Sequence, residues 1–127
     1  MSQLRHPIAT ARGLGSGKNG VHDWWMQRVT AVVLALLTPW FLIMVLGLVG
    51  KDYATTRLVF AQPISASLLL IFVLALFWHA RLGLQVVIED YIHARPLEVA
   101  LQLAVKLVFL FAAVLSVVSI GRLVFSA

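Results

Sequence analysis

Three long apolar stretches separated by short polar segments dominate the hydrophobic pattern of the chain. The first, Val29 to Gly50, holds twenty-two residues without a charge. The second follows Pro63 and is interrupted by His79 and Arg81, and the third follows Pro96. Since about 20 apolar residues suffice for a helix to cross the hydrocarbon core of a bilayer, the pattern predicts an all-α membrane protein. The predicted transmembrane helices cover about residues 27–50, 64–89 and 97–125.

The polar segments predict how the chain enters these helices. Residues 1–20 contain basic residues, no acid and a glycine-rich end, and they lack the apolar core of a secretory signal. We therefore expect an uncleaved basic tail over 1–20 and an anchor domain over 21–127. Asp23 is predicted to be the N-cap of the first helix, Arg28 to mark the edge of the hydrocarbon, and Pro39 to bend the helix.

Composition and charge narrow the class of protein. Hydrophobic residues make up 61% of the chain and charged residues 12%, which is outside the range of soluble globular domains. The absence of cysteine excludes disulfides and thiolate metal sites. The net charge of +5 does not indicate nucleic-acid binding, because the basic residues lie at the ends of apolar segments. Five of them fall on the N-terminal side and three on the other, so the N-terminus is predicted to be inside.

His79 is the first candidate for chemistry, because it lies about sixteen residues into the second helix and an ionisable residue at such a depth marks a functional site. One interpretation is an axial ligand of haem iron. The alternatives are a histidine hydrogen-bonded across a helix interface and a proton relay. Ala75 and Gly83, one turn away on either side, leave flat space beside the imidazole. No other histidine has a matching depth, so a second iron ligand would come from another chain.

A second group of candidates lies where this helix leaves the membrane. His79 and Asp90 are separated by about three full turns, or roughly 16 Å, and share a face. A tyrosine hydroxyl such as that of Tyr91 can donate to a quinone carbonyl, and a neighbouring carboxylate can pass protons. An interfacial tyrosine beside an acidic helix end is the alternative. Arg81 could pair with a haem propionate or a partner's acid, or extend to the interface. Lys106 must extend to the interface or find a partner.

Three features together resemble the hydrophobic membrane anchor subunits of bacterial succinate dehydrogenase. They are GVHDWWMQRVTA, which begins at Gly20, HARLGLQVVIEDY, which begins at His79, and a plain third helix. The resemblance covers roughly residues 14–125. It implies a four-subunit complex II of the tricarboxylic acid cycle and respiratory chain, in the bacterial inner membrane. A flavoprotein and an iron–sulfur subunit would pass electrons from succinate to ubiquinone, and a three-helix cytochrome b subunit would share haem b with this chain.

The resemblance also implies residue roles. His79 corresponds to the axial ligand of haem b iron, with the second ligand from the cytochrome b subunit. Tyr91 corresponds to the quinone-binding tyrosine with Asp90 beside it, and His22 and Arg28 correspond to positions near the haem propionates. Arg81 receives no role.

Two rival functions carry different expectations. A haem-free structural anchor for a soluble dehydrogenase or fumarate reductase would not need an imidazole at position 79. A small transporter or proton channel would be expected to show an inverted repeat or a membrane-embedded acid, and the sequence shows neither.

Overall fold

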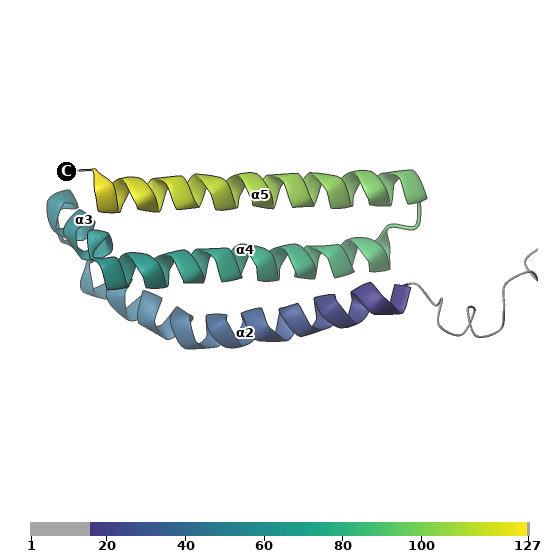
Figure 1. Ribbon diagram of the computed structural model, residues 1–127, viewed down its shortest axis with the longest axis horizontal. Helices are drawn as coiled ribbons and strands as arrows, with labels where there is room; N and C mark the ends of the chain where they lie inside the picture. Colours follow the sequence, from purple (N-terminus) through teal and green to yellow (C-terminus); the bar gives the residue numbers. More distant parts are fainter. Residues whose placement is uncertain (1–15, 127) are drawn as a thin grey trace, which may run out of the picture.

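The computed structural model describes residues 16–126, and this part of the chain is helical throughout apart from short connections. The three long helices are α2 (Ser16–Gly47), α4 (Pro63–Tyr91) and α5 (Arg95–Phe125). They lie side by side in one layer with α4 in the middle (Figure 1). Each is long and apolar enough to cross a membrane. The predicted all-α architecture with three transmembrane helices is confirmed.

The first helix begins earlier than the sequence pattern indicates. It starts at Ser16 and ends at Gly47, so that residues 16–20, which we assigned to the tail, are helical. The predicted N-cap at Asp23 is wrong, because this residue lies inside α2. A helix can continue through polar residues where no proline removes a backbone donor, and a glycine in it costs only about 1 kcal/mol relative to alanine. The remainder of the predicted tail, residues 1–15, lies outside the described residues.

The connection from the first to the second long helix is more ordered than expected. The sequence pattern indicates only a short polar connection between the first two apolar stretches, and most of this connection forms the short helix α3 (Tyr53–Ala61). The chain leaves α2 through Gly50, whose φ of 78° lies in the left-handed region that favours glycine. Pro63 then forces the preceding residue out of the helical region, which separates α3 from α4.

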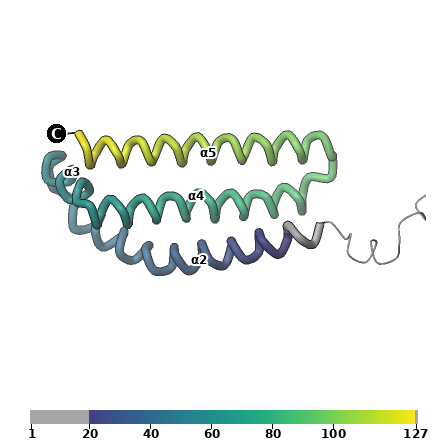
Figure 2. Tube along the Cα trace, in the orientation of Figure 1, coloured from purple at the N-terminus to yellow at the C-terminus, as the bar shows by residue number. Residues whose placement is uncertain are grey.

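The arrangement places the polar ends of the long helices together. The start of α2, the end of α4 and the start of α5 lie at one end of the layer, whereas α3 and the C-terminus lie at the other (Figure 2). Arg57 of α3 donates hydrogen bonds to the carbonyl and hydroxyl oxygens of Ser126, and this ties α3 to the end of α5. Figure 1 also shows that α2, which carries Pro39 in its interior, is bowed.

Packing within the layer is thin. The buried apolar residues of the described chain are few, and they come mainly from α4. Phe72 of α4 stacks on Phe41 of α2 at a centroid distance of 4.7 Å, and Phe77 meets Phe109 of α5 edge-on at 5.9 Å. A single layer has two open faces, and large apolar side chains are exposed along all three long helices. Lipid or a further membrane subunit can cover such faces, since contiguous apolar surface of this extent marks an interaction surface.

Candidate functional site

A cleft of about 860 Å³ lies between α2 and α4, near the end of the layer where α2 begins. This volume falls within the range of about 300–1,000 Å³ that cofactor and ligand sites occupy. The cleft is lined by Gly20, Asp23, Trp24, Gln27, Arg28 and Ala31 of α2, and by His79, Leu82, Gly83, Gln85, Val86 and Glu89 of α4.

His79 is partly buried in this cleft and its imidazole faces α2. Its Nδ1 lies 3.0 Å from the hydroxyl oxygen of Thr30, and its Nε2 lies 3.4 Å from the amide nitrogen of Gln27. The hydrogen bond across a helix interface, which was one of the interpretations from sequence, is therefore present. It engages Nδ1 closely and leaves Nε2 with only a long contact, so it is compatible with a ligand at Nε2.

Open space adjoins the imidazole, as the small residues in its neighbourhood predict. A Cβ atom added to Gly83 would meet no other heavy atom within 4 Å. Ala31 contributes a second small residue from the α2 side, whereas Ala75 is not among the residues that line the cleft. The cleft thus offers one imidazole and room for a flat group. Residues 16–126 contain no cluster of three or more potential metal ligands.

Gly83 allows a direct test of this space. If haem binds in this cleft, as one interpretation of His79 predicts, Gly83→Leu should fill the space beside the imidazole and lower the haem content of the assembled complex by about tenfold. Gly83→Ala, the matched control, should leave haem binding within about twofold, because the added methyl group enters open space and alanine favours a helix by about 1 kcal/mol over glycine. The measurement is haem per flavin in the purified complex. Equal haem content in the leucine and alanine variants would show that this space is not used.

The mouth of the cleft is polar. The side-chain amide of Gln85 donates to Glu89 at 3.0 Å and to Asp23 at 3.3 Å, which joins α4 to α2. Three residues at this site, Gln27, Thr30 and Gln85, were not predicted from the sequence. A signal was available, since Asp23, Gln27 and Thr30 recur at the spacing of one helix face.

Of the two residues that the resemblance placed near haem propionates, only Arg28 lines the cleft. Its guanidinium lies over the ring of Trp24, 5.4 Å from the centroid, and stays exposed. A cation at the cleft edge can attract an acidic group of a bound molecule. His22 is exposed and is not among the lining residues.

Asp90 and Tyr91 lie at the end of α4, outside the cleft. Both are exposed, and Tyr91 retains 77% of its accessible surface. Among the acids of this segment, Glu89 and not Asp90 lines the cleft with His79. The structure therefore brings together His79 and Arg28 and leaves the candidate quinone residues on the open surface at the same end of the layer.

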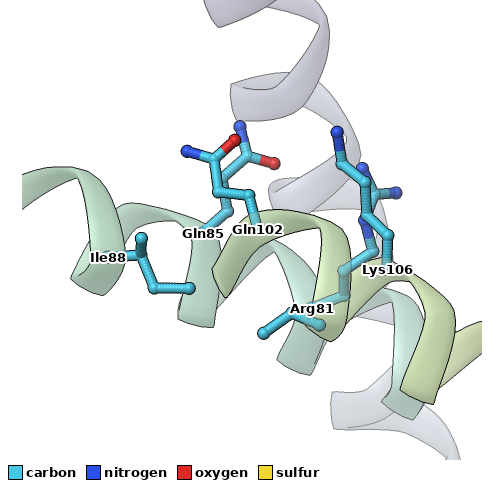
Figure 3. Close-up of a pocket in the computed structure, with 6 residues that line it drawn as sticks. Arg81, Gln85, Ile88, Gln102 and Lys106 are labelled. Atoms are coloured by element: carbon cyan, nitrogen blue, oxygen red, sulfur yellow. The ribbon is translucent and has the colours of Figure 1, made fainter. Parts of the chain in front are cut away.

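Arg81 and Lys106 share a separate, smaller pocket between α4 and α5 (Figure 3). The Arg81 guanidinium lies 5.2 Å from the ring centroid of Trp78, one turn nearer the start of α4, so it does not extend toward Tyr91. Its Nε is buried without a hydrogen-bond partner among the described residues. Arg81 thus lies in a different pocket from His79, as the rotation of about 200° between them indicates.

Comparisons with known proteins agree on one family. The model of the succinate dehydrogenase/fumarate reductase transmembrane subunit matches residues 2–118. The succinate dehydrogenase hydrophobic membrane anchor subunit of Rickettsia bellii is 39% identical over 117 residues, covering 92% of this chain and 94% of the relative. That of Paracoccus denitrificans is 34% identical over 85 residues, covering 67% and 66%. The succinate dehydrogenase membrane anchor subunit of Reclinomonas americana is 33% identical over 85 residues, covering 65% and 71%.

Proposed function

Because the chain belongs to the family of succinate dehydrogenase/fumarate reductase transmembrane subunits, we propose that it binds haem b and ubiquinone where it meets a cytochrome b subunit. It is a multi-pass membrane protein and a subunit of an enzyme complex, in the role of the succinate dehydrogenase membrane anchor that its relatives' names describe. Electrons from succinate would reach ubiquinone through a flavoprotein and an iron–sulfur subunit docked at the end of the layer where α4 ends.

The placement of His79 carries this proposal. A partly buried imidazole whose Nε2 has only a long contact, open space beside it and a cation at the edge of the cleft suit a haem held through one protein ligand. His79 would hold the iron from this side and the cytochrome b subunit from the other, while Arg28 would face the propionates. Haem b supplies one-electron redox chemistry when bound. The chain's own residues would orient it, and Leu82, Val86 and Ala31 would give it apolar contacts on this side.

Ubiquinone reduction would use the exposed end of α4. The Tyr91 hydroxyl can donate a hydrogen bond to a quinone carbonyl oxygen, and the Asp90 carboxylate can accept and pass on protons from water. Two electrons and two protons convert ubiquinone to ubiquinol. Since both side chains are exposed in this chain, the partner subunits would close the site over them and keep the quinone away from bulk water.

The membrane orientation follows from the same proposal. The excess of basic residues on the N-terminal side supports a cytoplasmic N-terminus in a bacterial inner membrane. The polar end of the layer, with Glu89 and Asp90, then faces the cytoplasm, where soluble partners can dock. Lipid and the cytochrome b subunit would cover the apolar faces. The proposed partners do not include nucleic acid.

Purification of the complex through an affinity tag on this chain tests the proposal. We expect the tagged chain to retain a flavoprotein, an iron–sulfur protein and a second hydrophobic subunit, with protohaem in the pyridine haemochrome assay and succinate:ubiquinone reductase activity. A complex with flavin and iron–sulfur centres but no haem would instead support a structural anchor for a soluble dehydrogenase or fumarate reductase. Recovery of the tagged chain without soluble partners would contradict both functions.

A further inference from the structure

Thr30 is the one buried polar side chain in the part of the chain whose burial the structure describes, with 6% of its surface exposed. Its hydroxyl oxygen lies 2.8 Å from the carbonyl oxygen of Met26 and 3.2 Å from that of Gln27, both on its own helix. The same oxygen lies 3.0 Å from Nδ1 of His79 on α4. Three polar atoms therefore converge on a single hydroxyl group.

The direction in which the Thr30 hydroxyl hydrogen points determines which ring nitrogen of His79 carries a hydrogen. A threonine hydroxyl has one hydrogen to donate and two lone pairs that accept. Backbone carbonyl oxygens only accept, so the contacts to Met26 and Gln27 use the hydroxyl hydrogen, as is common for threonine in helices. The remaining contact must then run in the other direction. This leaves a lone pair of the Thr30 oxygen to accept a hydrogen from Nδ1 of His79.

The second contact of the imidazole agrees with this assignment. A neutral histidine that carries its hydrogen on Nδ1 has a bare lone pair on Nε2. The atom that faces Nε2 is the amide nitrogen of Gln27, a hydrogen-bond donor, at 3.4 Å. The opposite tautomer would require the Gln27 amide to turn over and the Thr30 hydroxyl to give up the backbone carbonyls. The Thr30 contact carries this assignment. The Gln27 contact is long, and in this orientation the Oε1 atom of Gln27 is buried without a hydrogen-bond partner among the described residues.

We infer that Thr30 is a positioning residue that fixes the tautomer and ring orientation of His79, so that Nε2 is the atom offered to haem iron. This inference rests on the proposed haem site and deepens it. Histidines that bind metals commonly donate their other ring hydrogen to a protein oxygen, and loss of that oxygen typically weakens metal binding by about 10–100-fold. The Gln27 contact to Nε2 is long, and an incoming ligand would replace it.

Thr30→Val and Thr30→Ser in the full complex form a matched pair, since valine keeps the shape without the hydroxyl and serine keeps the hydroxyl. We expect the valine variant to bind haem about 10–100-fold more weakly, measured as the equilibrium transfer of haem to an apoprotein acceptor. Its low-spin haem signal in electron paramagnetic resonance should also change, because the ring is free to rotate. The serine variant should stay within about threefold of wild type in haem release and keep the wild-type signal.

The outcomes separate this inference from the haem proposal. Haem in all three complexes with the same affinity and signal would overturn the role of Thr30 and leave the haem site intact. A wild-type complex without haem would contradict the haem proposal.

In a haem-free complex, the tautomer of His79 can still be measured from the ring nitrogens of ¹⁵N-labelled histidine, with His79→Gln to assign the signal. A hydrogen on Nδ1 in wild type supports the inference, and a hydrogen on Nε2 overturns it. The same measurement applies if the valine variant does not assemble.

Discussion

Replacing His79 by alanine is expected to abolish the b-type haem signal of the assembled complex. His79 is the only imidazole among the residues that line the cleft, and no neighbouring side chain there offers a nitrogen ligand for iron in its place. Removing the imidazole leaves no unsatisfied hydroxyl on α2, because Thr30 keeps its hydrogen bond to the Met26 carbonyl, so we expect this chain to keep its fold. The measurement is the dithionite-reduced minus oxidised visible spectrum, normalised to flavin.

His93→Ala is the control for this experiment. His93 is exposed in the connection between α4 and α5, outside the cleft, so its loss should leave the spectrum unchanged. An unchanged spectrum in His79→Ala would contradict the assignment of the iron ligand. The imidazole would then be a packing residue that joins α2 to α4 through Thr30. Haem lost in both variants would indicate a general defect in assembly, which the ratio of flavin to tagged chain detects.

The three spans were predictable because a membrane helix carries its own signal, an uninterrupted apolar stretch of sufficient length. The extension of α2 to Ser16 carries no such signal. Outside the membrane the residues are polar, so hydropathy does not distinguish a continued helix from a loop. The short helix α3 was missed for a related reason. Its nine residues follow Asp52, a residue type that favours the N-cap position, but they form too short and too polar a segment to stand out from a connection.

The site was predictable in part. The depth of His79 and the small residue Gly83 one turn away are properties of a single helix, and both reappear in the cleft. Thr30 and Gln27 belong to another helix, and their contacts with His79 depend on how α2 is rotated against α4. How two helices are rotated against each other depends on packing over their whole interface. This rotation cannot be read from the residue spacing of one helix. Spacing on α2 indicates a polar face but not the residue that this face meets.

Phenylalanine in place of Tyr91 is expected to lower succinate:ubiquinone reductase activity by about 10–100-fold, the factor that corresponds to about 1.4–3 kcal/mol for a lost hydrogen bond to a reacting group. Folding should be unaffected, because the side chain is 77% exposed and the substitution removes only the hydroxyl. Reduction of a soluble dye by succinate should stay at the wild-type rate, since the flavoprotein passes electrons to dye without the quinone site.

Tyr53→Phe provides the matched control for Tyr91→Phe. Tyr53 is the other tyrosine of the chain and is 78% exposed, but it lies in α3, at the opposite end of the layer (Figure 1). Its substitution should leave quinone and dye reduction unchanged. Equal quinone reduction in both variants would exclude the Tyr91 hydroxyl from quinone binding. Parallel loss of dye reduction in Tyr91→Phe would instead place the defect in the docking of the soluble subunits, since dye reduction does not depend on the quinone.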